Sequence, residues 1–115
     1  MEKVKKGAIV NVASVVGLKG VAYMSAYGAA KAGLINFTRA TAIESAPHVR
    51  VNCIIPGAVM TPATERAIPD DKLMEATVNT IPLKRIAEPA ELAKPIAFLL
   101  SSDASFITCL LYTSD

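Results

Sequence analysis

A serine, a tyrosine and a lysine stand close together in the stretch "SVVGLKGVAYMSAYGAAK", which runs from residue 14 to residue 31. Tyr27 and Lys31 are four residues apart, so on a helix their side chains emerge on one face, one turn from each other. A free phenol titrates near about 10, and one that exchanges protons at neutral pH needs a nearby positive charge to favour the phenolate. An ammonium about 4 Å away supplies up to about 4 kcal/mol at an effective dielectric constant of about 20. The pair therefore predicts a proton-transfer site.

Ser14 ends the stretch "GAIVNVAS", whose β-branched apolar residues are typical of a strand buried on both faces in a parallel sheet. Open parallel sheets place their sites at the carboxyl ends of the strands, where a hydroxyl can hold a substrate oxygen. Between the strand and the helix, Gly17 and Gly20 are interpreted as giving the connecting loop its freedom. A dinucleotide-binding interpretation of "GLKG" fails because the third glycine is missing and no helix opens there.

Each of these residues also has a structural interpretation. A tyrosine and a lysine four residues apart can form an ordinary amphipathic helix surface, and Ser14 can cap a turn. The conjunction of all three with the later stretch "NCIIPGAVMT" favours the catalytic interpretation.

The rest of the chain alternates helical and strand patterns. The predicted elements are a helix over 27–46, a strand over 49–57, a loop over 58–68, a helix that begins at Pro69, a helix that begins at Pro89 and is kinked at Pro95, and a strand over 106–113. Strands that alternate with helices favour a parallel sheet with right-handed crossovers. We therefore expect an α/β fold.

The composition limits the classes of function. A chain of 115 residues is enough for one domain, and a hydrophobic fraction of 52% with a mean hydropathy of +0.40 indicates apolar surface that a partner covers. Scattered positive charges and a net charge of +2 argue against nucleic-acid binding, and no apolar run is long enough to span a membrane. Two cysteines and one histidine argue against a metal site. The opening segment lacks a cleavage site, so we expect the protein in the cytoplasm.

Four stretches carry a resemblance to a known family: "IVNVAS", "AYGAAKAGL", "VRVNCIIPGAVMTP" and "PLKRIAEPAELAKPIAFLLSSDASFIT". Over residues 7–108 the chain resembles the C-terminal part of the short-chain dehydrogenases/reductases. The resemblance implies a single partial domain over 1–115, made of the last three strands of a Rossmann-like, doubly wound parallel sheet and their helices. The N-terminal nucleotide-binding half is missing, and the tail "CLLYTSD", residues 109–115, is expected to be foreign to the family.

The resemblance also implies a reaction, in which hydride moves between a secondary alcohol or ketone and NAD or NADP. Tyr27 would be the general acid/base, Lys31 would favour its phenolate and bind the nicotinamide ribose, and Ser14 would polarise the substrate carbonyl. The cofactor-binding residues implied by the resemblance are Tyr27, Lys31, Pro56, Gly57, Val59 and Thr61. Residues 62–83 occupy the place of the family's substrate lid, and a homodimer or homotetramer is implied for the full-length protein.

Two departures from the family pattern matter. Ala30 replaces the serine usual in the family's Tyr-x-Ala-Ser-Lys motif, but both catalytic residues of that motif remain. The glycine-rich turn that holds the adenosine and pyrophosphate is absent from the chain. The alternative is therefore that the 115-residue chain is a catalytically inert truncated fragment or an oligomerisation module of such an enzyme.

Overall fold

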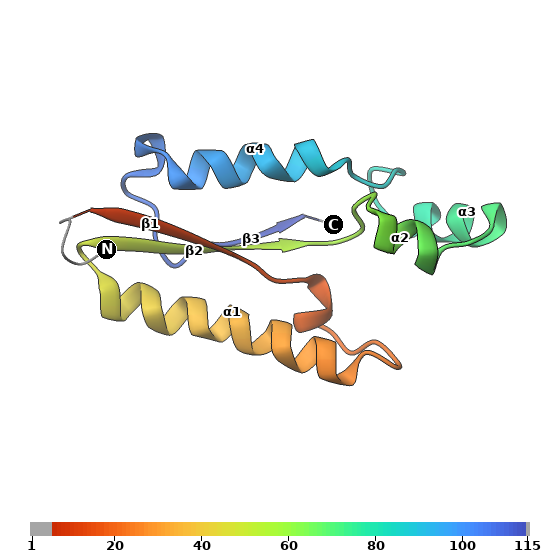
Figure 1. Ribbon diagram of the computed structural model, residues 1–115, viewed down its shortest axis with the longest axis horizontal. Helices are drawn as coiled ribbons and strands as arrows, with labels where there is room; N and C mark the ends of the chain where they lie inside the picture. Colours follow the sequence, from red (N-terminus) through yellow and green to blue (C-terminus); the bar gives the residue numbers. More distant parts are fainter. Residues whose placement is uncertain (1–5, 115) are drawn as a thin grey trace.

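The described residues, 6–114, form a three-stranded parallel sheet with helices on both faces in the computed structural model (Figure 1). The strands are β1 (Gly7–Val12), β2 (Val49–Pro56) and β3 (Leu111–Ser114), in the order β1-β2-β3. Helix α1 (Ser25–Ser45) covers one face and α4 (Pro89–Leu100) covers the other. The predicted α/β fold with a parallel sheet is confirmed.

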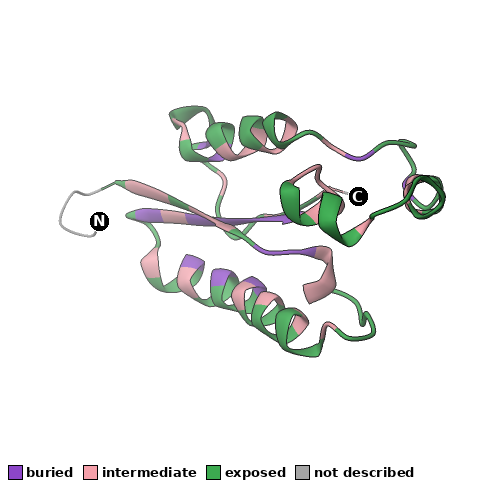
Figure 2. Ribbon diagram, turned by 45° about the vertical axis from the view of Figure 1, so that its right-hand side comes forward, coloured by how far each residue is buried: buried purple, intermediate pink, exposed green. Residues whose placement is uncertain are grey.

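Strand β2 is the centre of the core. Its β-branched side chains are all buried, and Figure 2 shows it as the longest buried stretch of the sheet. Against one face lie Ile35 and Ala42 of α1, and against the other lies Leu99 of α4. Since all three strands are parallel, their carboxyl ends meet at one edge, where sites of open α/β sheets form.

The first three elements lie close to their predicted bounds. β1 ends at Val12 rather than Ser14, and β2 ends at Pro56 rather than Gly57. α1 begins two residues earlier than predicted, at Ser25, because the Gly28 amide already donates to the Met24 carbonyl at 2.7 Å. It ends just before Pro47, as predicted.

The predicted loop over 58–68 is wrong for six residues, which form helix α2 (Pro62–Ala67). Thr61 caps this helix by accepting from the Thr64 amide, and proline is favourable at a first helical position. One and a half turns are too short to show a helical period. The next helix, α3 (Asp71–Asn79), begins two residues after Pro69 because Asp70 is its N-cap and accepts from the Leu73 amide.

The end of the chain differs most from its prediction. α4 begins at Pro89 as predicted and continues through Pro95, and a 3-10 turn, η2 (Ser102–Ala104), follows it. The predicted strand over 106–113 is wrong at its start, because β3 covers only Leu111–Ser114. Residues 106–110 instead form a turn in which Cys109 has a positive φ of 63°.

Helices α2 and α3 contain no buried residue and project from the rest of the molecule (Figures 1 and 2). Among residues 6–114, no helix is both long enough and apolar enough to cross a bilayer. Most of the tail predicted to be foreign forms β3 and pairs with β2, while residues 1–5 and 115 of the predicted domain lie outside the described residues. The foreign origin of the tail stays a prediction.

Candidate active site

Ser14 lies two residues beyond Val12, the last residue of β1, at the carboxyl end of the strand. The Ala13 amide donates to the Ile54 carbonyl at 2.8 Å, which holds the chain against β2 for one residue past the strand. Ser14 then begins the 3-10 turn η1 (Val15–Gly17), and its Oγ accepts from the Val16 amide at 3.2 Å. An accepting hydroxyl keeps its own hydrogen for another partner. Ser14 can therefore still donate to a substrate oxygen.

Lys31 connects the end of β1 to Tyr27. Its Nζ donates to the Val12 carbonyl at 3.1 Å, two residues before Ser14. The same Nζ lies 5.7 Å from the centroid of the Tyr27 ring, within the range of a cation–π contact. The tyrosine lies in the first turn of α1 and is 46% exposed. The structure therefore brings the ammonium to the tyrosine at the edge of the sheet where Ser14 lies.

The register of α1 on the sheet fixes this arrangement. Asn11 on β1 donates to the Thr38 hydroxyl at 3.0 Å, and that hydroxyl donates to the Leu34 carbonyl. Ile35 packs into the cluster that also contains buried Cys53 of β2. Burial raises the pKa of the Cys53 thiol, so this cysteine is a packing residue rather than a nucleophile.

The residues predicted to bind the cofactor follow the carboxyl end of β2, at the same edge. Pro56 is the last residue of β2, and the Gly57 amide donates to the Ser114 carbonyl at 2.6 Å. Val59 forms an isolated parallel bridge with Ala87, and Thr61 caps α2 with its hydroxyl. That bridge joins the two ends of the segment 60–86, which contains α2 and α3 (the 60–86 excursion). The bridge therefore closes this segment into a loop at the same edge of the sheet.

The donors at this edge fit the polar groups of a nicotinamide ribose and a carbonyl. Lys31 uses one of its three N–H groups on Val12, and the Tyr27 hydroxyl has no hydrogen-bond partner within residues 6–114. Ser14 keeps its hydroxyl hydrogen. Hydroxyl and carbonyl oxygens are the acceptors that such donors require. The assignment of catalytic and cofactor-binding roles to these residues stays a prediction.

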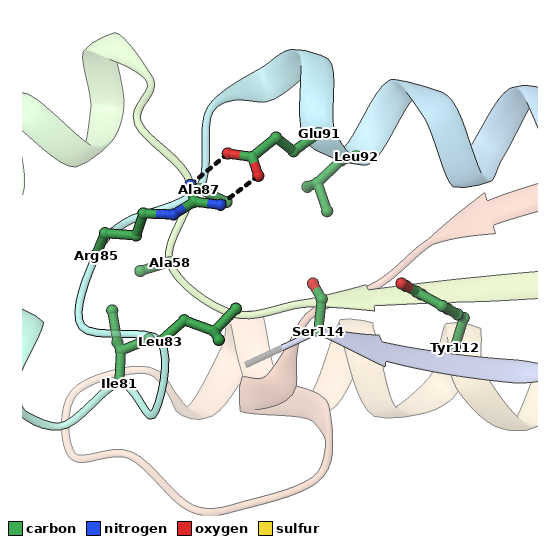
Figure 3. Close-up of a pocket in the computed structure, with 9 residues that line it drawn as sticks. All are labelled: Ala58, Ile81, Leu83, Arg85, Ala87, Glu91, Leu92, Tyr112 and Ser114. Atoms are coloured by element: carbon green, nitrogen blue, oxygen red, sulfur yellow. Dashed lines mark hydrogen bonds and ion pairs between the residues drawn. The ribbon is translucent and has the colours of Figure 1, made fainter.

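A separate hollow of about 190 Å³ lies on the α4 side of the sheet, near the carboxyl end of β3 (Figure 3). Its lining is mostly apolar and does not include Ser14, Tyr27 or Lys31. Arg85 and Glu91 are part of this lining, and Arg85 donates to both oxygens of Glu91 at 2.5 and 2.6 Å. Hydrogen bonding to Arg85, with a smaller contribution from the Glu88 amide, lowers the pKa of Glu91 to about 2.

The sequence pattern predicted a helix that begins at Pro89 but did not predict this ion pair. Its signal is an arginine six residues before a carboxylate in the first turn of a proline-led helix. The pair joins the return of the 60–86 excursion to α4, next to the bridge between Val59 and Ala87. It therefore belongs to the support of the site rather than to its chemistry.

Comparisons with known proteins match the whole chain. The family model described as enoyl-(acyl carrier protein) reductase matches residues 1–115. A 2,5-dichloro-2,5-cyclohexadiene-1,4-diol dehydrogenase of Sphingobium indicum is 43% identical over 110 residues, which cover 94% of this chain and 44% of the relative. The levodione reductase of Leifsonia aquatica is 38% identical over 122 residues, covering 100% of this chain and 46% of the relative.

A solved structure gives the same result. A dehydrogenase structure from Beutenbergia cavernae that holds NADP at low occupancy superposes with a TM-score of 0.90 at 34% identity, covering 95% of this chain and 44% of that chain. The chain thus spans less than half the length of these relatives, in agreement with a partial Rossmann-like sheet. With a family model matched from end to end and the fold of its members, the chain belongs to the short-chain dehydrogenase/reductase family.

Proposed function

We propose that the protein is an NAD(P)-dependent oxidoreductase that interconverts a secondary alcohol and a ketone by hydride transfer. Relatives named as dehydrogenases and reductases, and one relative's structure with bound NADP, support this class of reaction. The proposal concerns the complete enzyme, because this chain spans under half the length of those relatives.

One observation in the structure carries the proposal. The Lys31 ammonium is fixed by the Val12 carbonyl at 3.1 Å and lies 5.7 Å from the Tyr27 ring centroid. The contact brings a fixed positive charge to the ring of the residue that we propose as the acid/base. An ordinary surface lysine would extend into solvent instead of donating to the carbonyl at the end of a neighbouring strand.

Each of the three side chains then has one task. Bound nicotinamide supplies the hydride in the direction of reduction. Ser14 donates its free hydroxyl hydrogen to the ketone oxygen, and Tyr27 gives its proton to that oxygen as negative charge develops on it. Lys31 stabilises the phenolate that remains and donates to a ribose hydroxyl. In the direction of oxidation the phenolate takes the proton back.

The test is a pair of matched substitutions in the same stretch. Tyr27→Phe removes the proposed acid/base, and Tyr23→Phe removes the same hydroxyl from a fully exposed ring four residues earlier. Both are made in a chimera in which this chain replaces the aligned segment of the Leifsonia aquatica levodione reductase, and turnover is followed by NADH absorbance. We expect Tyr27→Phe to lower kcat at least about 100-fold and Tyr23→Phe to change it less than about twofold. Full activity of the Tyr27→Phe chimera would refute the proposal.

The alternative is that the 115-residue chain alone is an inert fragment. Its large exposed apolar side chains and its coverage of 44% of the first relative favour this alternative for the isolated chain. Titration of the chain with NADH and NADPH, followed by cofactor fluorescence, separates the two. Saturable binding would contradict the inert alternative, and the tighter of the two ligands would identify the cofactor.

By the same family membership we propose that the complete enzyme is a homodimer or homotetramer in the cytoplasm that acts on a small alcohol or ketone. Exposed Phe37 and Ile43 on α1 are apolar side chains that such a partner would cover. Size-exclusion chromatography with light scattering tests the oligomeric state.

A further inference from the structure

Gly17 lies at the end of η1. Its surroundings differ from those of Gly20, the other glycine of the same loop. A Cβ added at Gly17 would lie 2.8 Å from the Ala32 nitrogen and 2.9 Å from the Lys31 carbonyl carbon. A Cβ added at Gly20 would meet nothing within 4 Å. The turn that begins at Ser14 therefore sits directly on the backbone of α1 at Lys31, and only a residue without a side chain allows that approach.

The same contact exists from the helix side. A Cβ added at Gly28 would lie 3.1 Å from the Val16 carbonyl oxygen and 3.4 Å from the Val16 Cγ1. Two glycines, one on each element, thus allow η1 and α1 to approach each other. Along the helix, the contacts lie at Gly28, directly after Tyr27, and at the peptide bond between Lys31 and Ala32.

The turn is tied internally, so it moves as a unit. The Gly17 amide donates to the Ser14 carbonyl at 2.9 Å, and Ser14 Oγ accepts from the Val16 amide at 3.2 Å. Immediately upstream, buried Ala13 is fixed to Ile54 of β2. A displacement of Gly17 from α1 is therefore transmitted to Ser14, with the pivot at the link from Ala13 to Ser14.

We infer that Gly17 is a positioning residue of the proposed site, whose close approach to the backbone of α1 sets the place of the Ser14 hydroxyl relative to Tyr27 and Lys31. This inference rests on the proposed function. Opening the shortest contact from 2.8 Å to an ordinary 3.4 Å requires about 0.6 Å of movement. Misplacement of a reacting group by about 1 Å can cost about 100-fold in rate, so this movement corresponds to about tenfold or more.

The inference predicts which kinetic constant changes. α1 is held on β2 by its own packing, so Lys31 stays in place and keeps the contact that we propose with the nicotinamide ribose. The Ser14 hydroxyl moves. Gly17→Ala should then lower kcat for ketone reduction at least about tenfold and leave the KM for NADH within about twofold. A substitution that only loosened the fold would instead lower the thermal midpoint without this separation of constants.

The experiment has two arms, with Gly20→Ala as the matched control from the same loop. In the first arm, ¹H–¹⁵N spectra of the whole 115-residue chain are recorded for Gly17→Ala, Gly28→Ala and Gly20→Ala. We expect the amide signals of Ser14, Val16 and Ala32 to move in the first two variants and to stay in place in the control. In the second arm, the constants are measured in the levodione reductase chimera.

The two arms keep the proposals separate. If Gly17→Ala leaves both the Ser14 amide and kcat as they are in Gly20→Ala, the inference is overturned. If it raises the KM for NADH while kcat is unchanged, Gly17 positions Lys31 rather than Ser14, which also overturns it. If the amides move as expected but even the unsubstituted chimera has no turnover, the contact is supported and the proposed function fails.

Discussion

Asn52 of β2 is completely buried and holds the turn that leads into β3. Its Nδ2 donates to the Ile107 carbonyl at 3.1 Å, and its Oδ1 accepts from the Leu110 amide at 2.9 Å. The substitution Asn52→Asp keeps the shape of the side chain but removes the amide donor. The new carboxylate would then face the Ile107 carbonyl oxygen with no proton between them.

The cost of this change depends on pH in a direction that the structure fixes. Burial and the Ile107 carbonyl raise the pKa of the new carboxyl above its value in the unfolded chain. The Leu110 amide and the Arg50 guanidinium, which donates to the same Ile107 carbonyl, oppose this rise in part. The folded state therefore binds more protons than the unfolded state. The free energy of unfolding is then highest below about pH 4 and falls as the pH rises toward about 7. When protonated, the carboxyl can donate to Ile107 and accept from Leu110, much as the amide does.

The magnitude follows from the same environment. Full burial of a carboxyl changes its proton affinity by a factor of up to about 1,000, and each factor of ten is worth about 1.4 kcal/mol. Allowing for the opposing Leu110 amide and Arg50 guanidinium, the loss between about pH 4 and pH 7 is about 3 kcal/mol. This loss is a large share of the free energy of unfolding of an ordinary domain, which is about 5–15 kcal/mol.

Urea unfolding followed by circular dichroism at both pH values measures this loss. The control is Asn79→Asp, the same substitution at an exposed position at the end of α3. We expect the difference between the free energies of unfolding of the two variants to grow by about 3 kcal/mol from about pH 4 to pH 7. A difference that is independent of pH would show that the new carboxyl stays hydrated, and would refute the buried contacts of Asn52 with the turn.

Two further substitutions test the support of the sheet and of the loop. The Arg50 guanidinium donates to three carbonyls beyond β2, those of Leu99, Ser101 and Ile107. Arg50→Met should therefore lower the free energy of unfolding, measured by urea unfolding, by about 2–4 kcal/mol. As the control, Arg39→Met at an exposed position of α1 should change it by under about 0.5 kcal/mol. Arg85→Met should return the pKa of Glu91 from about 2 toward its ordinary value, because it removes the hydrogen bonds that lower this pKa. In the unsubstituted chain the pair contributes stability above the ordinary carboxyl range, and this stability is lost as the pH falls toward about 2. The side-chain carboxyl signal of Glu91 in an NMR pH titration measures the pKa, and an unchanged titration would contradict the pairing.

The elements that carry the three proposed catalytic residues could be predicted because their signals are local. The strand pattern before Ser14 and the helical spacing of Tyr27 and Lys31 depend only on neighbours in the chain, and β1 and α1 lie within two residues of their predicted bounds. Parallel pairing of β1 with β2 follows from the helix between them, since the crossover returns the chain in the same direction.

Elements that depend on distant partners were predicted less well. Residues 106–110 have an apolar, partly β-branched pattern that is typical of a strand. They form a turn because their backbone groups hydrogen-bond to Asn52 and Val51, which lie more than fifty residues earlier in the chain. In the same way, the carboxylate of Glu91 has a local use in starting α4, and only the folded loop brings Arg85 to it. Neither partner can be identified from a window of adjacent residues.

Gly17 and Gly20 show the same limit at the site itself. In the sequence both are glycines in a short connection, and both were interpreted as sources of freedom for the loop. None of the glycines within residues 6–114 has a positive φ, so the special backbone conformation that often explains a glycine is not required at either position. Gly20 has open space around it, and Gly17 has the backbone of α1. What makes Gly17 necessary is therefore its contact with the backbone of α1, up to fifteen residues further along the chain. Substituting each glycine by alanine distinguishes a glycine required by a close contact from one that only makes the connection flexible.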